Sequence, residues 1–301
     1  MLPIFLFGIC MFFAGPISTV DIKEILKYFI YGCLLAWFFC FFSAVFFKET
    51  YPLALSEGFS YFTTPLDFHP SYFGMYFILA FCIYTNLFDF DTNTKKITMA
   101  ICWILLLGLL IFLRSRGPLI AFVLISILLL TSLINNKGLI FVGVVTIILV
   151  LFNFEKFVAL LSYGRELEIG LGERLQIWKN SFQIISNNPI YGVGIGDVQA
   201  ELDLQYYFSG FDKGIDHRYN SHNQFLQTLV SSGLLGLIAL LGIFLSLLRR
   251  ARKFKLIYYF LIISLILMMV DSVLILQHGV YLFAFFASLF LKVDILDHEV
   301  K

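Results

Sequence analysis

Apolar residues fill this chain in long runs, and short polar or charged segments separate one run from the next. A helix of about twenty apolar residues spans the roughly 30 Å of hydrocarbon in a bilayer. Runs near that length predict nine spanning helices, at residues 2–20, 26–47, 71–88, 97–113, 117–134, 138–153, 223–248, 256–276 and 280–293. The pattern therefore predicts an all-α, polytopic membrane helical bundle, and we expect residues 1–301 to form a single integral membrane domain.

Composition supports the membrane class. Of the residues, 60% are apolar and 14% are charged, and the mean hydropathy of +0.89 is far above that of a soluble domain. A net charge of +1 gives no reason to expect a nucleic-acid partner. All five cysteines lie in apolar runs, which predicts small buried hydrophobes rather than disulfides or a metal site. The first run lacks a basic leader, so we expect a retained helix rather than a signal peptide.

The basic segment RRARKFK, at residues 249–255, sets the orientation, because such clusters stay on the cytoplasmic side. Counting spans from it puts DIKEILK, DFDTNTKK and NNK inside as connections. The amino terminus and the segments 48–70, 114–116, 154–222 and 277–279 then lie outside. Segment 154–222 is the large extracytoplasmic loop, and a loop of that length favours a functional role.

An amphipathic helix is predicted within this loop. The segment ERLQIWKNSFQII has apolar residues at three- and four-residue steps, namely Leu175, Trp178, Phe182 and Ile185. This spacing defines one helical face, which we expect to lie along the membrane surface with Trp178 at headgroup level. Arg174, one turn before Trp178, is expected on the same side.

A glycine-rich turn follows, in PIYGVGIGDV, with Gly192, Gly194 and Gly196. No strand precedes it and no helix completes a dinucleotide fingerprint, so the pattern argues against a nucleotide site. The glycines predict a tight backbone path or a close approach to a neighbouring helix or ligand. The next stretch, ELDLQYYFSGFDKGIDHRYNSHN, interleaves aromatic residues with acids and amides. That composition suits contacts with sugars, and tyrosine is also enriched at membrane interfaces.

Two arginines break the rule that short outward loops are poor in basic residues: Arg114 and Arg116, in FLRSRGPLIAF. One interpretation is that both snorkel to lipid headgroups. The other is that they line an outward-facing anionic site, because guanidinium groups beside a helix amino terminus suit phosphate oxygens.

His222 and Asn223 close the loop where the next helix enters the membrane. A histidine there can take a proton near neutral pH, as a general base must. Alternatively, Ser221 or Asn220 caps the helix and His222 is incidental.

Four further polar residues are candidates on position. His69, in DFHPSYFGMYF, lies outside just before a helix and either shapes a site or belongs to a capping turn. His217 and Arg218 are close enough in sequence to compete for the role of His222. Asp271 is the one carboxylate well inside an apolar run.

Four motifs in order resemble the O-antigen ligase and Wzy-type polymerase superfamily. They are SRG at the outer end of one helix, ERxxxW in an amphipathic helix, NPxxGxGxG in the following turn, and HN leading into SSGLLGL. The resemblance covers about residues 110 to 240. It implies an all-helical glycosyltransferase of the bacterial inner membrane, without a cofactor, nucleotide-sugar site or catalytic metal. Members transfer a glycan from an undecaprenyl-diphosphate carrier to a glycan or lipid A-core acceptor on the outer face.

The resemblance also implies roles for residues. Arg116 and Arg174 correspond to the family's arginines, which stabilise charge on the departing diphosphate, and His222 corresponds to its essential histidine, the base for the attacking hydroxyl. Direct attack would invert the anomeric centre. We expect the remaining candidates to contact the diphosphate or glycan: Arg114, Trp178, Asn223, His69 and Arg218.

Other classes stay open. A transporter or flippase for lipid-linked glycans would also need outward arginines, together with intramembrane charges such as Asp271. A non-catalytic scaffold would tolerate loss of His222 and Arg174. Within the enzyme class, the motifs do not separate a polymerase from a ligase or a protein O-oligosaccharyltransferase, and the size of the chain slightly favours a polysaccharide polymerase.

Overall fold

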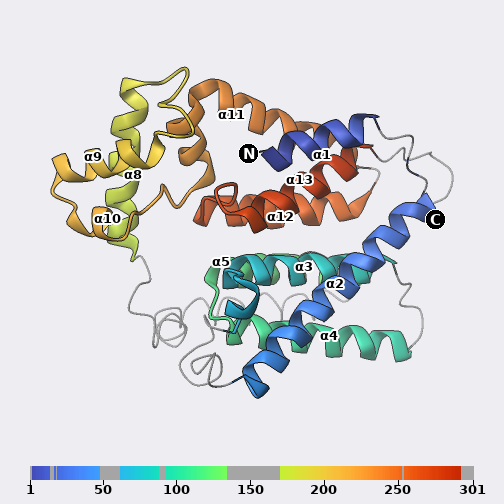
Figure 1. Ribbon diagram of the computed structural model, residues 1–301. Helices are drawn as coiled ribbons and strands as arrows, with labels where there is room; N and C mark the ends of the chain where they lie inside the picture. Colours follow the sequence, from blue (N-terminus) through green and yellow to red (C-terminus); the bar gives the residue numbers. More distant parts are fainter. Residues whose placement is uncertain are drawn as a thin grey trace. The chain divides into compact units, whose positions relative to one another are not determined.

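The computed structural model describes residues 2–13, 17, 19–47, 62–87, 93–133, 170–252 and 254–292. Within these ranges the chain forms eleven α-helices and one short 3-10 helix, with no β-strand (Figure 1). The predicted all-α class is therefore confirmed. In chain order the elements are α1 (Leu2–Phe13), α2 (Thr19–Phe46), η1 (Thr64–Leu66), α3 (Pro70–Leu87), α4 (Asn93–Phe112), α5 (Arg116–Leu133), α8 (Leu171–Asn187), α9 (Val198–Ser209), α10 (Asp212–Asp216), α11 (Gln224–Ala251), α12 (Lys255–Val270) and α13 (Gln277–Lys292).

Most predicted helices agree with these bounds, but the first two and the one predicted at 256–276 do not. The helix predicted at 2–20 ends at Phe13, and Gly15 and Pro16, which follow, both disfavour helix continuation. The DIKEILK segment, predicted as a connection, is the first part of α2. Asp21 lies in its first turn, where a negative charge is favourable, and Lys27 pairs with Glu24 at 2.6 Å. The span predicted at 138–153 and residues 154–169 of the large loop lie outside the described residues.

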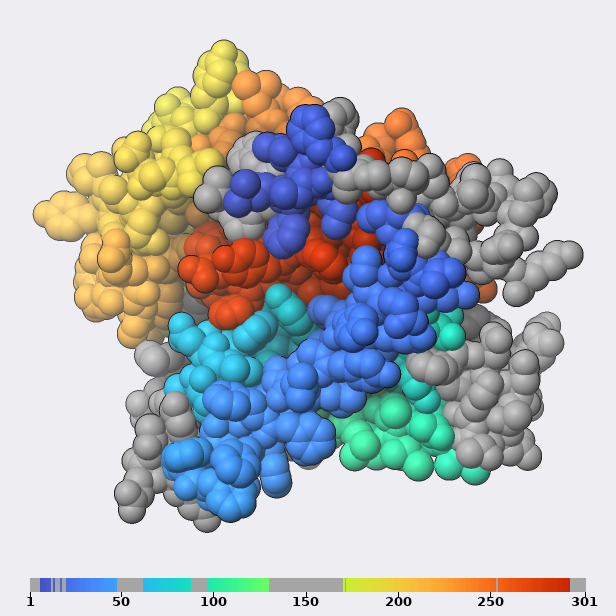
Figure 2. Space-filling model, turned by 45° about the vertical axis from the view of Figure 1, so that its right-hand side comes forward, coloured from blue at the N-terminus to red at the C-terminus, as the bar shows by residue number. Residues whose placement is uncertain are grey.

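Two helices in the described part are long and apolar enough to cross a membrane, Val20–Phe46 and Gln224–Ala251. Shorter apolar helices cover Ile97–Phe112, Arg116–Leu129 and Lys255–Val270. Figure 2 shows α2, in blue, on the surface of the molecule, and its exposed side chains are largely aromatic and aliphatic. A helix that is apolar toward its surroundings fits lipid rather than water. The membrane class is therefore supported, whereas the count of nine spans is not confirmed.

The chain divides into two compact units. The first unit comprises residues 1–15, 167–252 and 264–292. In it α13 packs against α1 and α11, and α8 packs against α9 and α11. The loop helices share a core with the start of α11, formed by Ile177, Ile184, Val198, Leu202, Tyr206, Phe211 and Val230. This core holds α8 and α9 against the start of α11.

The second unit comprises residues 16–166, 253–263 and 293–301. Its central helix is α3, which packs against α2, α4 and α5. A Cβ at Gly74 would lie 2.9 Å from side-chain atoms of both Leu110 and Pro118, so α3 approaches α4 and α5 very closely there. Trp103 Nε1 donates to Ser126 Oγ at 2.8 Å and joins α4 to α5.

The turn after α8 is fastened to a break in α11. Gly233 has φ of 61° and ψ of −157°, which interrupts the helix. Four backbone hydrogen bonds fill the interruption, from Val193 N to Val230 O, Gly194 N to Ser231 O, Leu234 N to Pro189 O and Leu235 N to Ile190 O. A Cβ at Gly233 would lie 2.2 Å from Ile190 O, and one at Gly192 would lie 2.6 Å from the backbone of Ser231. The predicted close approach to a neighbouring helix is confirmed for Gly192 and for the backbone of Gly194, whereas a Cβ at Gly196 would meet nothing within 4 Å. We call the contact of the turn with α11 the glycine clamp.

Candidate functional site

The first turn of α8 is tied to α10 by Glu173. Its Oε2 accepts a hydrogen bond from Gly170 N at 3.0 Å, and its Oε1 lies 2.9 Å from Lys213 Nζ. The hydrogen bond from Lys213 and the backbone bond from Gly170 lower the pKa of the Glu173 carboxyl, and the same pair raises the pKa of Lys213. The sequence predicted this helix, and its location is confirmed.

Two sides of α8 are apolar, and they have different surroundings. Leu175 and Phe182, on the face expected along the membrane surface, are 55% and 57% exposed. Ile177 and Ile184 are buried against α9 and α11 and form a packed face. A membrane contact of the first side stays a prediction, and periodicity did not reveal that the second side meets the protein.

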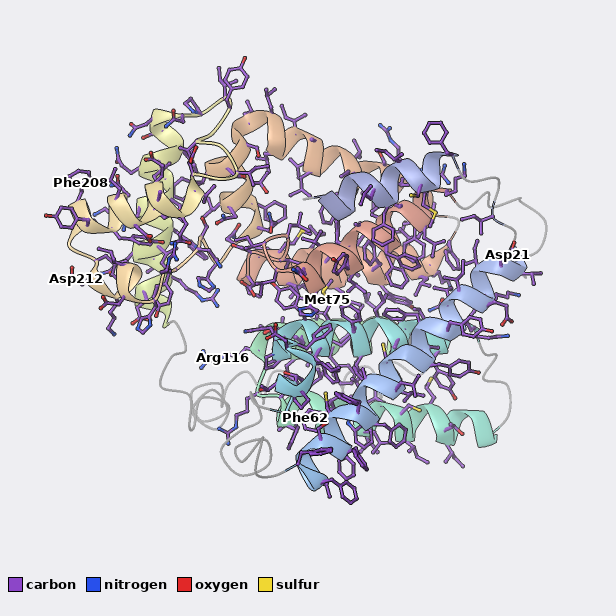
Figure 3. All side chains as sticks on the ribbon, in the orientation of Figure 1. Asp21, Phe62, Met75, Arg116, Phe208 and Asp212 are labelled. Carbon is purple, nitrogen blue, oxygen red and sulfur yellow. The ribbon has the colours of Figure 1, made fainter. Side chains whose placement is uncertain are left out.

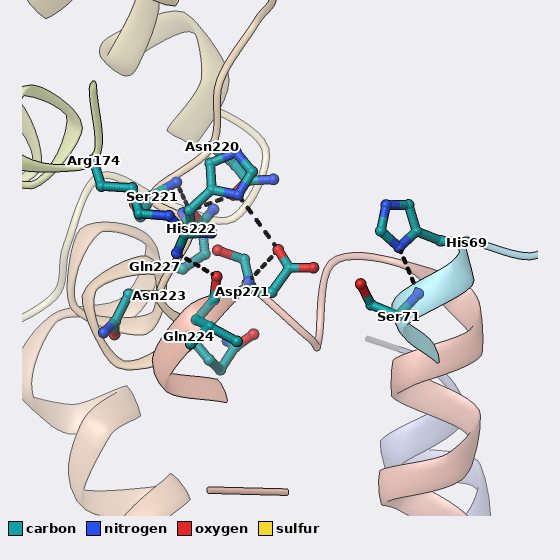
Figure 4. A network of polar contacts seen from close by, with 12 residues as sticks. His69, Ser71, Arg174, Asn220, Ser221, His222, Asn223, Gln224, Gln227 and Asp271 are labelled. Atoms are coloured by element: carbon teal, nitrogen blue, oxygen red, sulfur yellow. Dashed lines mark hydrogen bonds and ion pairs between the residues drawn. The ribbon is translucent and has the colours of Figure 1, made fainter. Parts of the chain in front are cut away.

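Arg174 reaches the end of α12. Its Nη1 donates to Val270 O at 2.7 Å, a contact that joins residues far apart in the sequence (Figure 4). The carbonyls at the end of a helix carry partial negative charge, which favours a cation there.

The turn before α11 is held from three directions at Ser221, which is completely buried. Trp178 Nε1 donates to its carbonyl at 3.1 Å, and its N–H donates to Gln227 Oε1 at 3.1 Å. Its hydroxyl accepts from Ser181 Oγ at 3.3 Å. Trp178 was expected at headgroup level as a substrate contact, whereas its indole nitrogen here fixes the turn that presents His222.

His222 adopts a φ of 42°, and the left-handed region costs a non-glycine residue about 1–3 kcal/mol. Its N–H donates to Asn220 Oδ1 at 2.8 Å. Its Nδ1 lies 3.6 Å from Asp271 Oδ1 (Figure 4). Tyr219 meets the ring edge-on with centroids 5.8 Å apart. The imidazole is thus held between a carboxylate and an aromatic ring, with Nδ1 toward the carboxylate.

Asn223 is the residue that caps α11. Its Oδ1 accepts hydrogen bonds from the N–H groups of Phe225 and Leu226 at 3.0 and 3.1 Å. Its Nδ2 donates to Met269 O at 3.2 Å. The sequence interpretation placed the cap at Ser221 or Asn220, which is wrong, because Asn223 has the extended backbone of a cap and its side chain accepts the first N–H groups of the helix.

Asp271 is the site residue whose partner the sequence did not reveal. The helix predicted at 256–276 ends at Val270, so Asp271 begins a turn rather than lying inside a span. Its Oδ1 also accepts from Ser272 N at 2.7 Å. The signal was present, since Asp followed by Ser favours a turn at the end of a helix. Asp271 thus lies at the end of a helix and not within one.

Two neighbours of His222 in sequence lie apart from this arrangement. His217 is exposed and stacks on Tyr219, with centroids 5.3 Å apart. Arg218 is exposed and has a φ of 49° in the turn that leaves α10. His217 therefore contacts the aromatic ring that in turn meets His222.

The remaining predicted site residues belong to the second unit, where they lie at the starts of α3 and α5. His69 Nδ1 accepts from Ser71 N at 3.3 Å, so the imidazole caps α3, as one of the two interpretations expected (Figure 4). Ser115 is buried and its Oγ donates to Ser71 Oγ at 2.9 Å. Arg114, with φ of 47°, and Arg116, the first residue of α5, flank Ser115. The serine bond therefore brings His69 and the two arginines to the same end of α3 and α5.

An open pocket of about 490 Å³ lies between the first turn of α8 and the start of α10. Its lining mixes apolar surface with four polar side chains and comprises Gly172, Glu173, Gln176, Gly210, Phe211, Asp212 and Lys213. Phe208 and Asp212 project outward from this part of the molecule in Figure 3. Amide, carboxylate and ammonium groups around one opening suit a hydroxyl-rich ligand.

Residues 101–241, just under half of the chain, match the family model described as O-Antigen ligase. This chain carries an O-antigen ligase family region. The resemblance argued from the four motifs is confirmed. No curated protein matches the chain by sequence.

The O-antigen ligase region contains Arg114, Arg116, helix α8 and His222, and it ends within α11. Asp271 lies beyond its end. The family and the apolar helices together indicate a membrane protein with a ligase- or polymerase-type activity on lipid-linked glycans. Whether each site residue acts as the resemblance implies stays a prediction.

Proposed function

We propose that this protein is a membrane glycosyltransferase that takes a glycan from an undecaprenyl-diphosphate donor and joins it to an acceptor on the outer face of the bacterial plasma membrane. The observation that carries the proposal is that His222 and Arg174 both meet the end of α12. Transfer from a diphosphate needs a base for the incoming hydroxyl and a cation for the departing charge. These two groups are supplied here by one small region of the first unit.

The topology proposed with it has nine spans. The basic segment at 249–255 lies in the cytoplasm, and residues 154–222 lie on the periplasmic side. Arg249 and Arg250, in the last turn of α11, support this orientation. His222, at the other end of that helix, then lies near the outer surface, where the lipid-linked glycan is presented.

His222 is the proposed general base. Because Nδ1 faces the Asp271 carboxylate at 3.6 Å, Nε2 is the nitrogen that takes the proton from the acceptor hydroxyl. The hydroxyl oxygen bonds to the anomeric carbon while the bond from that carbon to the diphosphate oxygen breaks. Asp271 stabilises the imidazolium that forms and orients the ring, as a carboxylate does for a catalytic histidine. Attack opposite the leaving group inverts the anomeric centre.

Arginines neutralise the leaving group in this proposal, without a catalytic metal. Arg174 is fixed by the bond to Val270 O, so its charge is in place before the diphosphate leaves, as preorganised catalysis requires. Arg116 and Arg114 are proposed to bind diphosphate oxygens, a role for which the planar fork of donors is suited.

An apolar groove in the second unit suits the lipid part of the donor. It holds about 190 Å³ between α2 and α3 and is lined almost entirely by apolar side chains, including Phe68 and Phe73. Phe68 directly precedes His69, so the groove begins beside the end of α3 where the arginines lie. An apolar groove in the same unit as two arginines suits a polyprenyl diphosphate. The polar pocket at α8 and α10 is proposed to hold sugars of the glycan.

The test is glycan profiling in a deletion strain complemented with the intact gene, His222→Ala, Arg174→Ala or Asp271→Asn, after each variant has been detected in the membrane. We expect His222→Ala to lower transfer by about 10²–10⁴-fold, the usual contribution of a general base. His217→Ala is the matched control, because it removes an imidazole from the same loop without touching Asp271.

The glycans that accumulate decide between the activities. Single lipid-linked repeat units would indicate a polymerase of O-antigen or another surface polysaccharide. Long carrier-linked chains without their lipid A-core or other acceptor would indicate a ligase. Normal glycans from His222→Ala and Arg174→Ala would contradict the proposal and favour a transporter, flippase or scaffold for lipid-linked glycans.

A further inference from the structure

Residues 188–196, which together with the exposed Asp197 connect α8 to α9, are apolar and exposed. This segment contains no charged residue, and Ile190, Tyr191 and Ile195 are 53%, 75% and 60% exposed. Single exposed apolar residues are ordinary on protein surfaces, but three within six positions form a patch that calls for an explanation.

The glycine clamp fixes where this patch lies along α11. Pro189 O and Ile190 O accept hydrogen bonds from Leu234 N and Leu235 N, at 2.8 and 3.3 Å. The backbone of the turn is therefore in direct contact with the first residues of α11 beyond Gly233. Ile190 and Tyr191 cannot move along the helix without breaking these bonds.

Beyond Gly233, α11 is apolar on opposite sides. One side packs against α13, with Phe244 and Phe283 in ring contact at 5.7 Å. The other side is exposed in a stripe with steps of three and four residues, at Leu234, Ile238, Leu241, Leu245 and Leu248. A helix with such a stripe faces lipid, and the stripe begins where the turn is attached.

The length of this part of α11 sets its depth in the bilayer. Leu234–Ala251 rises by about 27 Å at 1.5 Å per residue, close to the roughly 30 Å thickness of the hydrocarbon. Arg249 and Arg250 mark its cytoplasmic end. Gly233 therefore lies at the outer boundary of the hydrocarbon, the level at which tyrosine side chains concentrate.

We propose that residues 188–196 insert Ile190, Tyr191 and Ile195 into the outer leaflet and thereby anchor the helices α8, α9 and α10 at the membrane surface. The proposal rests on the topology given above. In this proposal the turn, and not Trp178, makes the contact with the membrane, since the indole nitrogen of Trp178 donates to Ser221 O. By anchoring the end of α8, the turn sets the height of Arg174 and His222 above the hydrocarbon. The occupant of the patch is phospholipid, because the patch continues the lipid-facing stripe of α11.

The experiment measures depth directly. In full-length protein with its five cysteines replaced by alanine, a nitroxide is attached at Tyr191→Cys and the protein is reconstituted in phosphatidylglycerol and phosphatidylethanolamine vesicles. Collisions with oxygen, which concentrates in lipid, are compared with collisions with a water-soluble nickel chelate. Ile238→Cys is the lipid reference and Asp212→Cys is the aqueous reference, since both positions are exposed.

We expect the oxygen-to-nickel ratio at position 191 to exceed that at position 212 several-fold and to approach that at position 238. A ratio equal to that at 212 would place the turn in water and overturn the proposal. Low accessibility to both reagents would overturn it too, because it would mean that protein, such as a second copy of this chain, covers the patch. The measurement involves no glycan transfer, so its failure is distinct from failure of the proposed enzyme activity.

Discussion

Gly233→Ala should unfasten the turn after α8 from α11. A methyl group at this position would lie 2.2 Å from Ile190 O and 2.3 Å from Ile190 C, both backbone atoms that cannot rotate away. The residue would also have to keep a φ of 61°, at a cost of about 1–2 kcal/mol for an L-residue with a side chain.

The size of the effect follows from the contacts that would be lost. Four backbone hydrogen bonds form the glycine clamp, and each contributes about 0.5–1.5 kcal/mol. Adding the cost of keeping a positive φ at an alanine gives an expected destabilisation of about 3–8 kcal/mol. It lies toward the upper end if the freed groups meet lipid instead of water. At about 2 °C or more per kcal/mol, the unfolding midpoint should fall by at least about 6 °C.

The assay is the thermal midpoint of purified protein in detergent, followed as loss of the monodisperse peak in size-exclusion chromatography. Gly242→Ala is the matched control, since this glycine lies in the same helix and a Cβ there meets nothing within 4 Å. It should leave the midpoint unchanged or raise it, by up to about 1 kcal/mol in stability. Equal midpoints for the two variants would refute the reasoning.

A second glycine tests whether the clamp acts as a unit. Gly192 has a φ of 67°, and its Cβ would lie 2.6 Å from the backbone of Ser231 and Ser232. Gly192→Ala should therefore destabilise the protein by a similar amount. Because both substitutions break the same contact, the double variant should be little worse than either one. Additive losses would mean that the two glycines support different contacts.

Three further outcomes follow from the site. The bond from Lys213 lowers the pKa of Glu173 in the folded protein. The ionised carboxylate therefore stabilises the folded state above the ordinary carboxyl pKa of 4.5, and this stabilisation is lost as the pH falls through the lower pKa of the folded protein. Glu173→Gln should thus flatten the acid side of a plot of unfolding midpoint against pH, whereas an unchanged plot would contradict the assignment. Trp178→Phe removes the donor to Ser221 O. It should lower stability by about 1–3 kcal/mol and reduce transfer, and full retention of both would show that the indole does not hold the turn. Arg174→Lys keeps the charge but not the planar fork, so transfer should fall well below that of the intact protein yet remain above that of Arg174→Ala. Identical glycan profiles for the two variants would argue against a role for the charge.

The sequence alone was sufficient for the class and for the order of the motifs. Apolar runs and the spacing of ERLQIWKNSFQII are local patterns, and local patterns determine whether a segment is helical because hydrogen bonds within a helix join residues four apart. For the same reason α8, α3, α5 and α13 begin and end close to the predicted positions. The glycines of PIYGVGIGDV could be assigned a close approach, since only glycine tolerates it, but not a partner.

Tertiary structure decided which residues meet. Asp271 lies beside His222 and Val270 O accepts from Arg174, and no periodic pattern links residues separated by that much chain. The buried face of α8 was likewise decided by its neighbours, because Ile177 and Leu175 are equally apolar and only packing against α9 and α11 distinguishes them. Long-range packing of the chain decides which helix face is covered and which carboxylate faces the histidine. A one-dimensional pattern contains the preferences of each segment but does not identify the segment against which it packs.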